Sequence, residues 1–164
     1  MRETALATLV LSLLPVLGAQ TAPADWIFVK DAKGACQIAV PPEWEPLSET
    51  AGAAIFRDAT TAIAAVTNQP GQAFKPLTAN MIKVLGIRKL FENSAKRIFY
   101  QDKVSRNAEE SNAYSASVPH KNGTCSCHVV VLPAVPEETA KRIASSLAPA
   151  EDQKLSTYAA PRQR

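Results

Sequence analysis

The feature that most constrains the fold is a turn sequence followed by a long apolar run in the last third of the chain. Asn122-Gly123 is typical of a tight β-hairpin turn, because these residues adopt the positive φ angles that such a turn requires. The segment from Cys125 to Leu132 follows, and its second half, from Val129 on, is apolar on both faces of a strand. A strand of this kind lies centrally in a sheet that is covered on both sides. The chain is therefore expected to build a sheet around this segment.

Earlier segments also have the composition of strands. Alternate residues of one of them, Cys36, Ile38 and Val40, share a face, since side chains alternate along a strand. Turn residues separate the members of each expected pair. The strands expected before the hairpin cover residues 26–29, 36–40, 53–56, 62–66, 97–100 and 113–118.

Two segments have helical spacing instead. Residues 77–91 place most of their apolar side chains on one wide arc, and Thr78 is a suitable N-cap, although Gly86 lies off the arc. Residues 136–147 begin with proline and two glutamates and form one apolar stripe. Pro149 ends that helix. Strands and helices together predict an α+β fold in which helices flank an antiparallel sheet.

The N-terminus is typical of a secretory signal peptide. Arg2 precedes an uncharged run from Ala5 to Ala19, and small residues follow. The run is short for a membrane-spanning helix, which needs roughly 20 apolar residues. Cleavage is expected after Ala19, with Ala22 as the alternative.

These boundaries divide the chain into three parts. Residues 1–19 form the signal peptide, residues 20–149 a single α+β domain, and residues 150–164 a polar, disordered tail. The protein is then secreted or periplasmic, and no transmembrane segment remains after signal removal. The formal net charge of +3 does not favour nucleic acid as the main partner.

One segment carries a family resemblance. The expected strand at residues 36–40 leads into Pro41-Pro42-Glu43-Trp44. Together with the order of the elements, this "proline, then tryptophan" turn resembles the PsbP-like sandwich proteins. The resemblance implies an antiparallel sheet flanked by helices and a non-catalytic role as a binding or assembly module, and it supplies no active-site residues.

The three cysteines are the main candidates for chemistry. In an oxidising compartment thiols tend to pair. Cys36 lies on an apolar strand face, and Cys125 and Cys127 share a face of the late strand. We expect a disulfide from Cys36 to either Cys125 or Cys127, and the sequence does not decide between them. Such a bridge stabilises the fold by roughly 3–5 kcal/mol.

A metal site is the competing interpretation. If Asn122-Gly123 forms a two-residue loop, His120 pairs with Cys125, and His120, Cys125 and Cys127 project from one face. Two thiolates and an imidazole suit zinc or copper. His128 points to the other face. Because a fourth ligand is not evident, the disulfide is favoured.

Catalytic sequence patterns are not found. There is no Gly-rich phosphate loop and no Gly-x-Ser-x-Gly elbow, and nothing in the sequence positions a serine triad around either histidine. The pair Glu109-Glu110 is expected in a solvated loop. No catalytic residues and no cofactor are predicted.

The segment from Lys75 to Arg106 is locally basic. It indicates either a solvated face or attraction to an anionic surface, such as lipid head groups or an acidic envelope polymer. The candidate residues for anionic-surface binding are Lys83, Arg88, Lys89, Lys96 and Arg97.

Two functions follow from these observations. The first is an exported, non-catalytic binding or accessory module of the cell envelope with an unidentified partner. The alternative is a thiol-based metal-binding or redox protein that uses Cys125, Cys127 and His120.

Overall fold

The computed structural model describes residues 23–50, 53–57, 62–106, 109–131 and 136–150. The expected signal peptide, residues 1–19, lies outside these residues, as does the expected tail at residues 150–164 except for Ala150, whose N–H donates to the carbonyl oxygen of Ala35 over 2.9 Å. The described elements follow one another as β1 (Ile27–Lys30), β2 (Cys36–Val40), β3 (Glu45–Thr50), β4 (Ala53–Arg57), β5 (Ala62–Pro70), α1 (Ala79–Val84), β6 (Lys89–Asn93), β7 (Ile98–Arg106), β8 (Glu109–His120), β9 (Gly123–Val131), α2 (Glu137–Ser145) and β10 (Ala148–Pro149).

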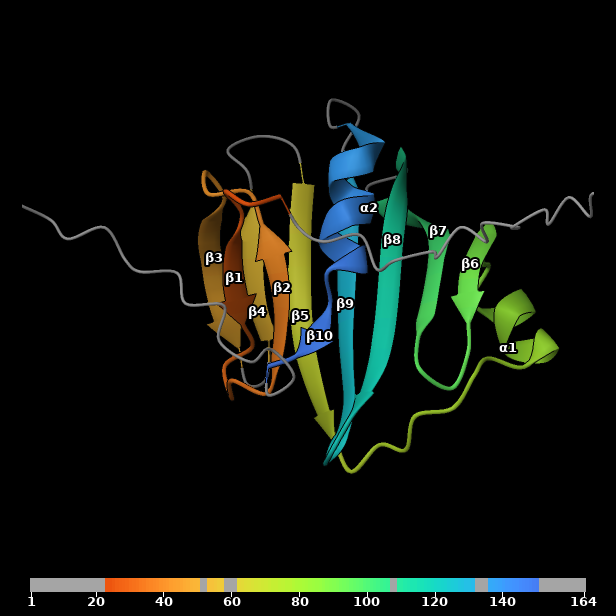
Figure 1. Cartoon of the computed structure of the whole chain (residues 1–164). Coiled ribbons are helices and arrows are strands. Elements are labelled where there is room, and N and C mark those ends of the chain that lie inside the picture. The colour runs from red at the N-terminus through yellow and green to blue at the C-terminus, as the bar shows by residue number, and fades with distance from the viewer. Residues whose placement is uncertain (1–22, 51–52, 58–61, 107–108, 132–135, 151–164) are drawn as a thin grey trace, which may run out of the picture.

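The strands form two antiparallel sheets. The larger has the order β3-β4-β5-β9-β8-β7-β6, and the smaller has the order β1-β2-β10. The smaller sheet and α2 lie against one face of the larger sheet (Figure 1). The expected α+β sandwich with an antiparallel sheet is confirmed.

The core lies between these layers. Strand β9 occupies the middle of the larger sheet, between β5 and β8, as its apolar sequence predicted. Alternate β9 residues point toward α2, whose apolar stripe is fully buried against them. The core side chains include Ile38, Val40, Val66, Val129, Ala140, Ile143 and Ala144.

The "proline, then tryptophan" turn contributes a side chain to this core. The backbone N–H of Trp44 donates to the carbonyl oxygen of Pro41 over 3.1 Å, which closes the turn after β2. Trp44 is buried in the core cluster. The turn therefore brings a large aromatic side chain back beneath the smaller sheet.

The loop of the β8–β9 hairpin lies one residue earlier than predicted, which shifts each cross-strand partner by two residues. His120 pairs with Gly123, and Val118 with Cys125, so the two-residue loop is Lys121-Asn122. The close approach of β5 explains the position of the glycine. A Cβ atom on Gly123 would lie 2.3 Å from the carbonyl oxygen of Gln69. Only a residue without a side chain fits there, so the glycine belongs to the strand and not to the loop.

The helix predicted at residues 77–91 is correct only in its first half. Helix α1 ends at Val84, and Gly86 adopts φ 64°. Gly86 donates its N–H to Lys83, and Ile87 donates to Ile82, each over 3.2 Å, which is the glycine-based Schellman ending of a helix. The chain then pairs with β7 as strand β6, so backbone pairing prevails over the helical spacing of the remaining apolar residues.

Other differences concern polar segments. Strand β3 was not expected, because its sequence has little apolar alternation. Glu109-Glu110 begins β8 and does not lie in a loop. Strand β5 continues through residues predicted to end it, and Pro70 is its last residue. The C-terminal helix is confirmed, and β10 follows it directly.

Candidate functional site

The disulfide joins the two sheets. It links Cys36 of β2 to Cys125 of β9, with 5.5 Å between the Cα atoms. Both side chains are fully buried, and 89 positions separate them in the sequence. This is one of the two pairings that the sequence left open.

Cys127 is a buried free thiol. Its Sγ atom lies 3.6 Å from the carbonyl oxygen of Ala144 in α2, to which the thiol donates. Burial raises the pKa of Cys127 to about 12. Since metal ions and redox partners react with the thiolate, this side chain is a poor ligand near neutral pH. Cys125 is bonded to Cys36, and the ligand atoms that lie together are those of Cys36, His120 and Cys125, so the predicted set with Cys127 is not assembled among the described residues.

His120 lies beside the sulfur atoms of the disulfide instead. One ligand atom from each of Cys36, His120 and Cys125 falls within 4.8 Å of the others. Nε2 of His120 is 2.9 Å from Oδ1 of Asn68, and Nδ1 accepts the backbone N–H of Asn122 over 3.3 Å. A cavity of about 240 Å³ adjoins the histidine. Its walls are Ala35, Asn68, Pro70, His120, Lys121, Asn122 and Pro149.

A serine–histidine pair lies on the opposite face of the larger sheet. The strand register places Ser115 opposite His128, and Oγ of Ser115 is 2.8 Å from Nδ1 of His128. Tyr100 of β7 hydrogen-bonds to the same serine, and burial raises the pKa of Tyr100. A recess of about 220 Å³ lies over these strands. Sequence reasoning missed this pair, because it depends on the register of β7, β8 and β9.

The pair lacks the rest of a hydrolytic site. Asp102 lies near enough to His128 for electrostatic attraction, but Oδ1 of Asp102 is buried without a hydrogen-bond partner among the described residues. Ser115 is in the middle of β8, whose backbone pairs with β7 on one side and β9 on the other. Backbone N–H groups near the serine are thus committed to the sheet and unsuited to an oxyanion hole. The geometry supports a polar recess, not a catalytic triad.

The predicted basic residues separate into two groups. Lys83, Arg88, Lys89 and Lys96 are exposed. Arg97 is half-buried, and its Nη2 atom donates to the carbonyl oxygens of Ser145 and, over 3.1 Å, Leu147. Arg97 therefore holds the end of α2 to the sheet, and it is not available to an anionic surface.

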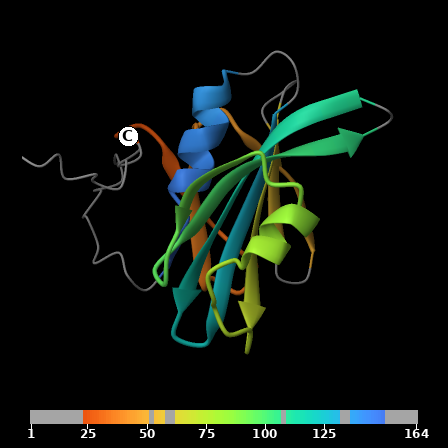
Figure 2. The ribbon, with the colours of Figure 1, turned by 90° about the vertical axis from the view of Figure 1, so that its right-hand side faces the viewer.

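The same segment carries exposed apolar side chains on α1, on β6 and between them, which we call the α1–β6 surface. Its members are 45% (Met81), 77% (Val84), 47% (Leu85) and 38% (Leu90) exposed. None of the six residues of α1 is buried. Figure 1 places α1 beyond β6 at the edge of the larger sheet, and Figure 2 views that edge directly. Two other exposed apolar residues, Ile27 and Phe28, lie on β1.

Local bonds hold α1 in place without core packing. Oγ1 of Thr78 accepts the N–H of Met81 over 3.3 Å and caps the helix. The side-chain amide of Asn93 exchanges two hydrogen bonds, of 2.8 and 3.0 Å, with the backbone of Leu77. The Asn93 bonds attach the start of α1 to β6, and the threonine cap and the glycine ending define the two ends of the helix. The helix presents a defined apolar surface to water.

Basic residues outnumber acidic ones around this surface, although β6 also carries Glu92 and Arg88 interacts electrostatically with Glu110. Residues 75–91 contain Lys75, Lys83, Arg88 and Lys89 and no acidic residue. Nζ of Lys89 lies 5.2 Å from the ring centroid of Phe91, a cation–π contact that leaves its charge at the surface. The α1–β6 surface is therefore both apolar and cationic.

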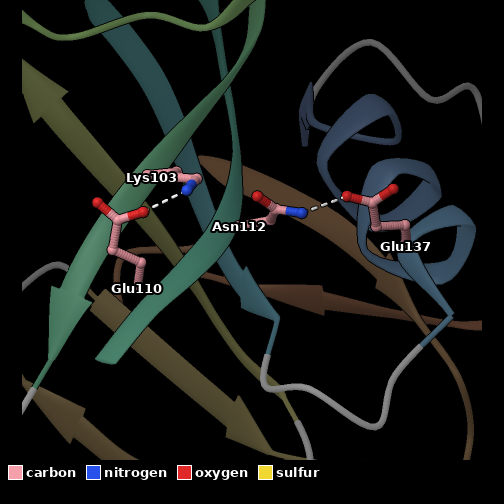
Figure 3. A network of polar contacts seen from close by, with 4 residues as sticks. All are labelled: Lys103, Glu110, Asn112 and Glu137. Atoms are coloured by element: carbon pink, nitrogen blue, oxygen red, sulfur yellow. Dashed lines mark hydrogen bonds and ion pairs between the residues drawn. The ribbon is translucent and has the colours of Figure 1, made fainter. Parts of the chain in front are cut away.

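The carboxylates near α2 are already paired. Figure 3 shows Asn112 of β8 donating to Glu137 in the first turn of α2, and Lys103 of β7 bonding to Glu110. Gln101 also donates to Glu137, over 3.2 Å. The Lys103 ammonium lowers the pKa of the Glu110 carboxyl. The bonds to Glu137 join α2 to β7 and β8, and the Lys103–Glu110 pair joins β7 to β8.

Neither of the two helices in the described part of the chain is long and apolar enough to cross a membrane.

Comparison with known proteins finds solved structures with a similar fold, but it does not identify a family. No protein-family model matches the sequence, and no curated protein is significantly similar to it. A protein of Bacteroides thetaiotaomicron aligns with a TM-score of 0.54 at 11% identity over 76% of this chain. This chain spans about half of that protein, 48% of its length.

Two other solved structures are similar. The Ran-binding protein Mog1p of Saccharomyces cerevisiae has a TM-score of 0.50 at 10% identity, covering 75% of this chain and 94% of Mog1p. The cyanobacterial PsbP protein (CyanoP) of Synechocystis has a TM-score of 0.42 at 12% identity, covering 85% of this chain and 98% of that protein. The PsbP-like resemblance expected from the sequence is a weak likeness of fold, and the alignments that reach a TM-score of 0.5 are those with the Bacteroides protein and Mog1p. At these identities the likeness concerns the fold alone.

Proposed function

We propose that this protein is an exported, non-catalytic binding module of the cell envelope, and that it docks on anionic lipid through the α1–β6 surface. The observation that carries the proposal is a locally fixed helix with none of its residues buried, in a segment without acidic residues. The signal-peptide pattern at residues 1–19 supports export.

The apolar side chains supply the first part of the binding energy. A large apolar side chain transferred fully from water contributes about 1.5–3 kcal/mol. Met81, Val84, Leu85 and Leu90 are partly exposed, so each gains a fraction of this value when covered. Because α1 is already ordered by its own caps, little further conformational entropy is lost on docking.

The cations supply the second part. A lysine or arginine near an anionic bilayer contributes about 1 kcal/mol. Lys83 lies within α1, Arg88 directly precedes β6, and Lys89 is the first residue of β6. A surface with apolar side chains between cations matches the boundary between head groups and acyl chains.

Lipid suits the shape better than an acidic protein or polymer does. Helix α1 projects from the edge of the larger sheet (Figures 1 and 2), and the two cavities described above are lined by other residues. A projecting apolar surface needs a deformable partner or a matching pocket. A soluble polyanion would use the cations but leave the four apolar side chains in water.

Vesicle sedimentation tests the proposal. The purified protein should bind vesicles of phosphatidylglycerol and phosphatidylcholine and should not bind phosphatidylcholine alone. The double variant Lys83→Ala/Arg88→Ala should bind about 30-fold more weakly, since two cations contribute about 2 kcal/mol. The matched control Lys30→Ala/Lys33→Ala removes the same charge near the smaller sheet and should bind normally.

A second pair of variants separates lipid from polymer. Val84→Ser/Leu85→Ser keeps every charge and should weaken vesicle binding at least about tenfold. Binding that resists these substitutions, together with equal binding to soluble polyglutamate, would assign the surface to an acidic polymer. Absence of vesicle binding by the unsubstituted protein would contradict the proposed function.

A further inference from the structure

The disulfide and the histidine beside it form a constellation that membrane docking does not use. Cys36 comes from β2, and Cys125 and His120 come from the β9 and β8 arms of one hairpin. One ligand atom from each residue lies within 4.8 Å of the other two. The sequence predicted a set containing Cys127, and the structure replaces that residue with Cys36.

We propose that Cys36, Cys125 and His120 form a redox-gated zinc site, which is closed while the disulfide is intact and opens when a dithiol reductant cleaves it. The reductant transfers two electrons and two protons to the disulfide, which becomes two thiols, and the reductant becomes a disulfide. Zn²⁺ then binds both sulfur atoms as thiolates and the imidazole as a neutral ligand, and two protons are released.

The distances suit this exchange. In a tetrahedral zinc site with bonds of about 2.3 Å, two sulfur ligands lie about 3.8 Å apart. The Cα atoms of Cys36 and Cys125 are 5.5 Å apart, so both sulfur atoms can reach one metal ion between the two strands. The two strands are held in place by other contacts, since β2 and β9 both pack under α2. The thiols are therefore expected to stay close together after reduction.

The surroundings of His120 suit a metal ligand. Both ring nitrogens are hydrogen-bonded now, one to the side chain of Asn68 and the other to the backbone of Asn122. A metal ion takes the place of one of these contacts, and the other keeps the ring oriented, as partners of metal-bound histidines commonly do. Asn68 is itself fixed, because it pairs with Cys125 across β5 and β9.

Three protein ligands leave one position of a tetrahedral zinc ion open. The cavity of about 240 Å³ beside His120 provides space for water there. The bound metal ion would then join the two sheets in place of the disulfide, through its bonds to Cys36 and Cys125.

Metal titration of oxidised and reduced protein tests the proposal. After reduction with a phosphine, which does not compete strongly as a thiol ligand, the protein should bind one equivalent of Zn²⁺ and release two protons. Co²⁺ used as a probe should give a thiolate-to-cobalt absorption band. The oxidised protein should show neither result.

Two histidine variants test whether His120 is the side chain that binds the metal ion. His120→Asn should weaken binding by more than about 100-fold, since even outer-shell substitutions cost 10- to 100-fold. The matched control His128→Asn alters the histidine on the other face of the sheet and should bind normally. Cys127→Ala should also bind normally. Equal affinity in the His120 variant, or loss of binding in the Cys127 variant, overturns the assignment.

Reduction of the protein could unfold it, and the titration remains decisive in that case. One equivalent of Zn²⁺ should then restore the native circular dichroism spectrum of the unsubstituted protein but not that of His120→Asn. Failure of zinc to restore the fold, or equal restoration in both proteins, contradicts a built site. The outcome does not depend on vesicle binding, so the zinc site and the lipid-docking surface are tested independently.

Discussion

The two helices have similar apolar patterns, but the apolar stripe of α2 is buried and that of α1 is exposed. Helix α2 buries Ala140, Ile143 and Ala144 against the larger sheet. Helix α1 buries none of its residues, and Val84 is 77% exposed. An apolar stripe indicates that a surface is suited to being covered, but it does not say by what. The chain itself covers the stripe of α2, whereas we infer that a lipid surface covers that of α1.

The means of stabilisation differ accordingly. Most helices in proteins are stabilised by tertiary packing, as α2 is. Helix α1 depends on a threonine cap, a glycine ending and the bonds between Leu77 and Asn93. A short helix held by local bonds is expected to be less protected than one that covers the core. Substitutions at the two helices should therefore have effects of different size and kind.

The largest difference should appear in the reactivity of the thiol beneath α2. At pH 8 the thiolate population of Cys127 should be about 1,000-fold lower in the folded protein than in urea, because its pKa is raised from 9.0 to about 12. Alkylation by iodoacetamide in the folded protein should then rise about tenfold per pH unit from 8 to 11. In urea the rate should level off above about pH 9. Levelling off at the same pH in the folded protein would show that α2 does not cover the thiol as described.

Core truncation should show the next largest effect. Ile143→Ala should reduce the free energy of unfolding by about 3 kcal/mol, since it removes a fully buried side chain. The matched truncation Val84→Ala on α1 should change it by less than about 0.5 kcal/mol. Urea unfolding followed by circular dichroism measures both values. A comparable loss from the two substitutions would mean that α1 packs against the protein in solution.

The smallest effect should come from the ending of α1. Gly86→Ala places a side chain at φ 64° and should cost about 1 kcal/mol. Because the helix is not part of the core, the cost should appear as faster hydrogen exchange within residues 79–84 and leave the thermal midpoint almost unchanged. The matched substitution Ala79→Gly tests helix propensity without altering the ending. A large drop in the midpoint for Gly86→Ala would show that α1 is coupled to the core.

The sequence predicted the parts of the fold that depend on local pattern. The apolar segment around Val129 became the central strand, and residues 136–147 gave the helix that covers it. The helix at residues 77–91 was half wrong, because pairing with β7 converts its second half into β6. Strand β3 has no apolar alternation and exists through its pairing with β4. Pairing partners far apart in sequence are not encoded in a local period.

The candidate sites were predictable to a similar degree. Composition alone drew attention to the cysteines and to the basic segment containing Lys83 and Arg88. The choice of Cys125 over Cys127 required the register of β9 and the position of α2. The role of Arg97 as a backbone-bound anchor, and the pair of Ser115 with His128, also depended on tertiary contacts that a sequence without its fold does not contain.

The most direct measurement of the central claim uses a fluorescent side chain on α1. In the variant Val84→Trp, the emission of the new tryptophan should shift to shorter wavelength when phosphatidylglycerol vesicles are added, and it should not shift with phosphatidylcholine vesicles. The unsubstituted protein, whose tryptophans Trp26 and Trp44 lie far from α1 in sequence, provides the background. An unchanged emission from a variant that still sediments with the anionic vesicles would show that another surface meets the lipid.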